Sequence, residues 1–424
     1  MSLLLRFLSP AKQCQTGAEQ ARSEDCIIAA SLDAQVLRHA GLHGLKIACP
    51  SPTAEDTARD LHRLRGQFLA RQDMWSDLSA AIQEADHTLA MTPAGMPVAD
   101  LLSYGARSDV VAAVEHVLSE GRPFENAPLL DGIEALEAVL SEAPNDPILA
   151  ATVAHTHMDI GWAWRGGHWL DQVPTRKLLA FEAHFDRARE ILAGLPDLPS
   201  DSAFVQGARC ALNASGMIRG ADIAREYEDL IALNPKTPAP MRALGNYLTP
   251  KWYGSYETLE LAARRVAGRT HNDWAAGGYT WVMLDALTSD LDVCGILDTA
   301  FFVEGLEDIL TRHPDQHTVN TLVAFCAHSL GARRGTTPQV ESVRSRLAAC
   351  ADWIIRSHLT ELHPLVWAHA AAGFDNSLPV RSPRRFAAKG QQDGLRAIAA
   401  LFQSDIDAGR QIIFTTDGPI AEHP

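Results

Sequence analysis

The sequence lacks the short motifs that mark widespread catalytic and nucleotide-binding folds. Its 424 residues contain no G-x-S-x-G, no H-E-x-x-H and no Walker sequence. They show no sustained alternation of strand and helix patterns, which weakens Rossmann, P-loop and barrel interpretations. The 17 histidines are dispersed, so no catalytic triad can be assigned. The sequence predicts no cofactor.

Paired cysteines are also missing. No C-x-x-C pair occurs, and the cysteines are odd in number and scattered. This distribution argues against a disulfide framework and a cysteine zinc site, and it favours reduced thiols in a cytosolic compartment. The seven cysteines are Cys14, Cys26, Cys49, Cys210, Cys294, Cys326 and Cys350.

Long hydrophobic runs are absent, since no apolar stretch approaches a membrane-spanning length without a charge. The N-terminus from Met1 to Leu8 is apolar, but Arg6 interrupts it, and it shows neither a basic leading region nor a clear cleavage site. We therefore expect a soluble, cytoplasmic protein without a membrane partner.

Basic residues are few relative to acidic ones. Lysine and arginine total 37 against 52 aspartates and glutamates, which gives a formal net charge of −15 and a pI near 5.5. Such a charge repels phosphate backbones and anionic lipid, so nucleic acid and membrane surfaces are not expected partners. Acidity at this level is also common in soluble bacterial proteins.

The composition is that of a globular protein, with 46% hydrophobic and 21% charged residues. A chain of this length exceeds the needs of one core, so two domains or one elongated array is expected. Residues 1–52 form a poorly specified N-terminal segment. Residues 53–330 are predicted to form a helical-repeat array, and residues 331–424 to form C-terminal helices and an extended tail.

The clearest pattern lies between Ile223 and Ala267, where apolar side chains recur at helical spacing on three successive segments. The first segment ends at Asn234, because the residue before a proline is pushed out of the α region. The second matches the first-helix template of a tetratricopeptide unit. Its template residues are Met241, Leu244, Gly245 and Leu248. In the following turn, Gly254 can supply a positive φ and Ser255 is a good N-cap.

Similar amphipathic helices that end in proline turns recur along the chain, at Pro144, Pro196, Pro235 and Pro314. Their spacings of 52, 39 and 79 residues are irregular. They predict an all-α fold of irregular tetratricopeptide-like helical hairpins, stacked as an α-α superhelix. Further helices are expected at 53–72, 74–89, 98–104, 108–119, 132–142, 272–288, 296–312, 317–330, 337–357, 363–372 and 383–408. Residues 411–416 have strand composition and predict a short, extended C-terminal tail.

One stretch favours a metal site. His155, His157 and Asp159 alternate with other residues, as ligands do on an extended loop, and the stretch resembles the H-x-H-x-D motif of zinc-dependent α-mannosidases. The resemblance implies zinc held by either histidine together with Asp159. A helix from Ile148 to Trp164 is the favoured interpretation, because alternate residues of a helix cannot meet at one ion.

A second candidate is the turn of Lys251, Trp252, Tyr253 and Tyr256, whose aromatic and basic side chains suit a ligand pocket or a partner contact. The same aromatics also suit packing between neighbouring hairpins, with the lysine stem lying across an indole. The sequence leaves both interpretations open.

Residues Leu248 to Ser255 read L-T-P-K-W-Y-G-S, and the W-A-W-R-G segment upstream contains Trp162, Trp164 and Arg165. Together they resemble an uncharacterised bacterial family of tetratricopeptide-like repeat proteins with a PKWxGS-type turn. The resemblance spans about residues 55–330. It implies a helical-repeat fold and brings no known activity or catalytic residue.

Our first hypothesis is a non-enzymatic helical scaffold that binds a peptide or protein partner through its concave face or its aromatic turn. The alternative is a metal-dependent, glycosidase-like hydrolase that uses His155, His157 and Asp159. A third is a structural protein that self-associates through its tryptophan-rich helices.

Overall fold

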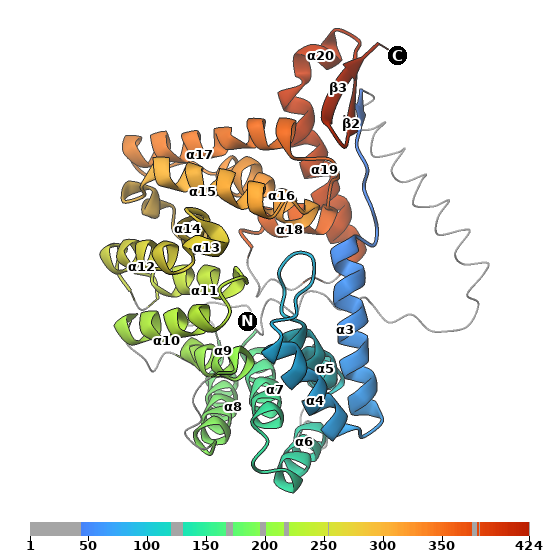
Figure 1. The fold of residues 1–424 in the computed structure, drawn as a ribbon, viewed down its shortest axis with the longest axis vertical. Coiled ribbons are helices and arrows are strands. Elements are labelled where there is room, and N and C mark those ends of the chain that lie inside the picture. Colours follow the sequence, from blue (N-terminus) through green and yellow to red (C-terminus); the bar gives the residue numbers. More distant parts are fainter. Residues whose placement is uncertain are drawn as a thin grey trace, which may run out of the picture. The chain divides into compact units, whose positions relative to one another are not determined.

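The computed structural model describes residues 44–119, 130–166, 173–195, 201–215, 220–252, 254–374, 380 and 382–423. Helices dominate this part of the chain (Figure 1), which confirms the all-α fold class. The chain divides into two compact units between Ala286 and Leu287. We call residues 54–286 the first unit. The second unit comprises residues 44–53 and the described residues from Leu287 onward. The boundary expected at residue 330 falls inside the second unit.

The named secondary-structure elements in the described residues of the first unit are all helices. Its elements are α3 (Ala54–Arg71), α4 (Trp75–His87), α5 (Val98–Ser119), α6 (Asp131–Glu142), α7 (Pro147–Arg165), α8 (Thr175–Ala193), α9 (Ala203–Ala211), the 3-10 helix η4 (Leu212–Ser215), α10 (Gly220–Leu233), α11 (Ala239–Tyr247), α12 (Tyr256–Arg269), α13 (His271–Trp274) and α14 (Gly277–Ser289). Helix α14 ends three residues beyond the division between the units.

Two of these elements differ from the expected ranges. The helices expected at 98–104 and 108–119 form one continuous helix, α5. The single helix expected at 272–288 is instead interrupted at Ala275, whose φ is +48°. A non-glycine residue in this left-handed conformation gives little sequence signal, so the break was missed.

Glycines bring α3 and α5 into close contact. A Cβ atom added at Gly66 would lie 1.9 Å from the carbonyl oxygen of Leu102. One added at Gly105 would lie 1.8 Å from the carbonyl oxygen of Arg63. The two backbones therefore touch where both side chains are absent.

The second unit combines helices with a small sheet. Its helices are η5 (Leu291–Gly295, 3-10), α15 (Thr299–Arg312), α16 (Gln316–Ala324), the π-helix η6 (Phe325–Leu330), α17 (Pro338–Ser357), α18 (Pro364–Ala371), α19 (Pro383–Leu401) and α20 (Gln403–Asp407), and its strands are β1 (Leu45–Lys46), β2 (Gln411–Thr415) and β3 (Gly418–Glu422). The helix expected at 383–408 is split at Phe402 into α19 and α20.

A buried asparagine organises the interior of the second unit. The Oδ1 atom of Asn320 accepts bonds from the backbone N–H of His363 and from the indole Nε1 of Trp367, each at 2.9 Å. Its Nδ2 donates to the carbonyl oxygens of Gln316 and Glu361. Because each of these polar groups has a hydrogen-bond partner, Trp367 is fully buried and its indole N–H remains hydrogen-bonded.

The C-terminal strand is paired and not merely docked. The sheet order is β1-β2-β3, with β1 parallel to β2 and β2 antiparallel to β3. The hairpin turns at Thr416 and Asp417, and Gly418 has a φ of +107°. The Asp-Gly dipeptide is a known hairpin signal, and its partner strand was missed in the sequence.

Several helix starts follow capping chemistry. The side chain of Ser255 accepts a hydrogen bond from the backbone N–H of Thr258 at 3.2 Å, as predicted for an N-cap. Gly254 serves a different purpose from the one expected, because a Cβ atom there would lie 2.2 Å from the carbonyl oxygen of Leu248. Close approach of the backbone, and not a positive φ, requires this glycine.

Among the described helices, we find none whose length and apolar character would allow it to cross a membrane.

Candidate functional site

The expected metal ligands lie on one uninterrupted helix. Helix α7 runs for 19 residues from Pro147 to Arg165, capped by Asp146, which accepts bonds from two backbone N–H groups. His155, His157 and Asp159 are all buried on it. The favoured interpretation of this stretch as a helix is confirmed, and alternate residues therefore point away from each other.

Asp159 forms an ion pair with an arginine. Its Oδ2 accepts a bond from Nε of Arg107 at 2.7 Å, and both side chains are almost completely buried. Arg107 also donates to the hydroxyl of Ser103. Burial lowers the pKa of neighbouring His155 to about 3, so this imidazole is neutral, and its Nδ1 atom has no hydrogen-bond partner. The group is a structural ion pair inside the first unit.

His157 belongs to a different network. Its Nδ1 lies 3.0 Å from Nδ1 of His184, and its Nε2 lies 2.8 Å from Oε1 of Glu137. Arg187 donates to both oxygens of Glu137, which is therefore ionised. His157 must then donate its Nε2–H to Glu137 and accept at Nδ1 the proton of His184. Burial lowers the pKa of His184 to about 4.

The three candidate metal ligands on α7 therefore lie in separate environments and do not share a partner. Across the part of the chain that the structure describes, no group of three or more His, Cys, Asp or Glu side chains is placed to hold a metal ion. The geometry gives the metal-dependent hydrolase hypothesis no support.

The expected aromatic turn is partly exposed. Lys251 is exposed, and Trp252 keeps 39% of its surface accessible while its ring meets the edge of Tyr247 at 6.0 Å between centroids. Tyr256 is half-buried and begins α12. Tyr253 lies outside the described residues. Trp252 therefore packs on its own hairpin with one face still available to solvent.

The upstream aromatics mainly join α7 to α8. Trp162 contacts Phe181 and Phe185 edge to face, at 5.2 and 6.2 Å between ring centroids. The guanidinium of Arg165 lies over the Trp162 ring, 5.1 Å from its centroid. Trp164 is half-buried on the same helix. The structure does not place these residues in a pocket with the Lys251 turn among the described cavities.

The most unusual surface was not predicted as one. Leu61, Leu64 and Phe68 on α3 retain 65%, 51% and 58% of their surface. Their spacing of three and four residues places them on one face, which we call the α3 stripe. The helix expected at 53–72 is present as α3, but these three large apolar side chains do not lie in the core, whereas Leu69 does.

The opposite face of α3 is buried although it is polar. Glu55 accepts bonds from the Thr92 hydroxyl at 2.7 Å and from the Ala94 backbone N–H at 2.9 Å. Arg59 is buried beside it, and burial lowers the pKa of its guanidinium. A charged face inside and an apolar face outside reverse the usual arrangement of a surface helix.

A sequence signal for this reversal exists. Gly66 lies on the buried face, and a glycine inside a helix indicates close helix packing on its own side. The larger apolar residues Leu61, Leu64 and Phe68 lie on the other side.

No known protein family, curated protein or solved structure matches this chain.

Proposed function

We propose that the protein is a non-enzymatic helical scaffold and that it binds a protein partner through the α3 stripe. The observation that supports this proposal is the exposure of Leu61, Leu64 and Phe68 at helical spacing, on a helix whose charged face is already buried. Leaving three large apolar side chains in water has no stabilising role in the isolated chain. Contiguous apolar surface of this kind marks interaction sites.

The occupant that fits is an amphipathic helix of another protein. From Leu61 to Phe68 the stripe spans seven residues, or about 10 Å, which matches two helical turns of a partner. Such a partner would supply apolar anchors at positions i, i+3 or i+4, and i+7. The scaffold would contribute a rigid helix, since α3 is held by its backbone contact with α5.

A second copy of the chain fits this surface less well. Arg65 is exposed beside Leu64, and antiparallel pairing of two stripes about their centre would bring two such guanidinium groups together. The formal net charge of −15 also opposes self-association. These charges favour a heterologous partner.

The cytoplasm is the compartment we propose for this binding. Four buried cysteines of the described residues, Cys210, Cys294, Cys326 and Cys350, are free thiols. Reduced thiols of this kind suit a cytosolic protein.

The test combines site-directed cross-linking with surface variants. A photo-reactive amino acid at Arg65 should capture a partner in cells, and the contacting partner segment should read as an amphipathic helix. That segment, made as a peptide, should bind the purified chain at least about tenfold more weakly after the double substitution Leu61→Glu and Phe68→Glu.

The matched control is Leu261→Glu on α12, because Leu261 is 56% exposed but stands apart from the α3 stripe. This variant should bind the peptide as the unmodified chain does. Equal binding by the stripe variant, or cross-links only to other copies of this chain, would exclude the proposal.

A further inference from the structure

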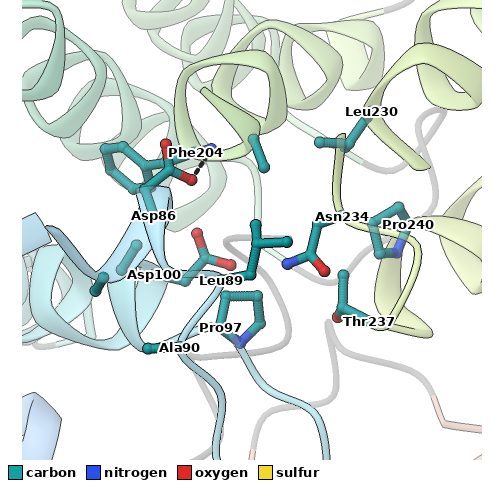
Figure 2. A pocket seen from close by; sticks show the side chains of 13 residues that line it. Asp86, Leu89, Ala90, Pro97, Asp100, Phe204, Leu230, Asn234, Thr237 and Pro240 are labelled. Carbon is teal, nitrogen blue, oxygen red and sulfur yellow. Dashed lines mark hydrogen bonds between the residues drawn. The ribbon is translucent and has the colours of Figure 1, made fainter. Parts of the chain in front are cut away.

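A short loop covers a small cavity within the first unit (Figure 2). The loop consists of residues 89–97, between the end of α4 and the start of α5, and we call it the strap. Both ends of the strap line the cavity, which has a volume of about 20 Å³. The other walls come from α4, α5, α9 and the segment from α10 to α11. A movement of the strap would therefore open the cavity.

The strap keeps several polar side chains of the cavity wall from water. Figure 2 shows Asp100 on one side and Asn234 and Thr237 on the other, with Leu89 and Pro97 of the strap between them. The Oδ1 atom of Asn234 and the Oγ1 atom of Thr237 are buried and have no hydrogen-bond partner. Each such atom costs about 1–3 kcal/mol, because it has lost its water. Opening of the strap would remove this cost.

Glu55 on α3 fastens the middle of the strap. Its carboxylate accepts bonds from the Thr92 hydroxyl at 2.7 Å and from the backbone N–H of Ala94 at 2.9 Å. The Thr92 hydroxyl in turn accepts a bond from the backbone N–H of Met96 at 3.0 Å. At the start of the strap, Leu89 has a φ of +49°, a left-handed conformation that is unfavourable for leucine. A few bonds thus hold a loop that is strained where it begins.

The closed cavity disfavours a charge on Asp100, which is 8% exposed. Burial raises the pKa of Asp100 to about 7, although the chain's N-terminal ammonium and the guanidinium of Arg107 lower it. The charge of Asp86 on α4 raises this pKa further. On α7, Asp159 is paired with Arg107 and His155 is neutral. The cavity-lining residues of α9, α10 and α11 are uncharged. Burial therefore outweighs the two cations.

The two carboxyl groups of the cavity wall differ in their hydrogen bonds. Asp86 accepts a bond from the backbone N–H of Phe204 at 2.9 Å, drawn as a dashed line in Figure 2, and another from the hydroxyl of Ser202. Burial raises the pKa of Asp86, and these two donors offset part of the rise. No described residue donates a hydrogen bond to the carboxyl of Asp100. Ionised Asp100 therefore depends on water for its donors.

We propose that the strap is a lid, which is closed while Asp100 is protonated and opens when Asp100 ionises, so that water hydrates the carboxylate. Opening breaks the bonds between Glu55 and the strap and also admits water to Asn234 and Thr237. The closed state binds the proton of Asp100 more tightly than the open state does. The equilibrium between the two therefore shifts toward the open state as pH rises through neutrality.

Hydrogen exchange of the full chain, followed by mass spectrometry from pH 5.5 to pH 8, tests this lid. The reporters are strap amides such as those of Ala94 and Met96, with each rate divided by the intrinsic rate at that pH. If Asp100 in the open state has its ordinary pKa of 3.8, the corrected rates should rise about 30-fold over this range. They should exceed those of α7 at least about 100-fold at every pH, because local opening costs less than global unfolding.

Variants assign the effect to its residues. Asp100→Asn should remove the rise with pH, because asparagine does not ionise. Asp77→Asn, at an exposed position on α4, should keep the rise. Thr92→Val removes the hydroxyl between Glu55 and Met96, and it should speed strap exchange at least about fivefold at pH 5.5 and pH 8 alike.

Three outcomes would overturn the proposal. Equal corrected rates in the strap and in α7 would mean that the strap opens only when the whole chain unfolds. Corrected strap rates that do not change with pH would mean that ionisation of Asp100 does not move the strap. A 30-fold rise that persists in Asp100→Asn would assign the effect to another group. If Asp100→Asn does not fold, the first two comparisons in the unmodified chain and in Thr92→Val still decide the matter.

Discussion

At the scale of single residues, Asp100 controls how stability depends on pH. Its pKa is about 7 in the folded chain and near 3.8 when unfolded, so the folded state holds the proton more tightly between these values. The free energy of unfolding therefore falls as pH rises from about 4 to 7, by on the order of 4 kcal/mol for this group. The loss is complete about one unit above the folded pKa, near pH 8.

The substitution Asp100→Asn should remove this loss. Compared with the unmodified chain in sodium buffers, the variant should gain stability progressively from pH 5 to pH 8, and urea titrations at each pH measure the difference. Asp77→Asn, at an exposed position, should show no such trend. A constant difference between the Asp100→Asn variant and the unmodified chain across this range would contradict the buried carboxyl.

His155 acts in the opposite direction. Its folded pKa of about 3 lies below the unfolded value of 6.5, so the unfolded state binds the proton first and stability falls as pH drops below 6.5. At pH 5 this group costs about 2 kcal/mol relative to pH 7.5. The effect overlaps that of Asp100 between pH 4 and 6.5, so only variants separate the two.

We expect His155→Leu to lose less stability than the unmodified chain when pH is lowered from 7.5 to 5, because leucine takes up no proton. Denaturant unfolding at the two pH values gives the comparison. The control is His87→Gln at an exposed position, which should follow the unmodified chain. An equal acid sensitivity of the His155→Leu variant and the unmodified chain would mean that His155 is not buried as a neutral imidazole.

At the scale of elements, α3 shows how packing can reverse a hydrophobic pattern. Its contact with α5 depends on Gly66 and Gly105, where an added Cβ atom would lie within 2 Å of a carbonyl oxygen. Gly66→Ala should therefore destabilise the chain by about 1–3 kcal/mol or more, although alanine is the better helix former. Urea unfolding at neutral pH measures the loss.

The matched comparison is Gly268→Ala on α12, where an added Cβ meets nothing within 4 Å. There the gain in helix propensity, up to about 1 kcal/mol, should appear without a steric penalty. If both alanine substitutions stabilise the chain, then α3 and α5 do not pack backbone to backbone.

Local chemistry determined which elements the sequence could predict. Ser255 caps its helix through atoms three residues away, and the expected helical range of α7 likewise depends on nearby residues. Pairing of β1 with β2 joins residues more than 360 positions apart, for example Leu45 with Ile412, and no short window contains that information. The same holds for the cavity at Asp100, whose walls come from five helices and the segments that connect them.

The exposure of the α3 stripe could not be predicted from the sequence for a different reason. The periodicity of Leu61, Leu64 and Phe68 correctly predicts a helix, but periodicity alone does not say which face meets the protein. Bulk hydrophobicity normally decides that question, and here the glycine contact and the buried bonds of Glu55 decide it instead.

At the scale of the whole molecule, the division between units falls at residues 286 and 287. Helices α15 and α16 and the π-helix η6 all end at or before residue 330, yet residues that contact them follow it. Asn320 binds the indole of Trp367, the hydroxyl of Ser329 donates to the carbonyl of Ala370, and Arg344 donates to the carbonyl of Leu330. A cut at 330 therefore removes the groups that cover the apolar faces of these helices.

Two fragments of the chain test this division. The fragment 54–289 keeps α14 whole and should be monomeric in sedimentation velocity, with a cooperative thermal transition by circular dichroism. The fragment 54–330 should self-associate, because Phe302, Phe325 and Leu330, each fully buried in the full chain, lose the cover of α17 and α18. If instead the longer fragment is the well-behaved monomer and the shorter one aggregates, the boundary lies near 330, and the helices before it pack as one continuous array.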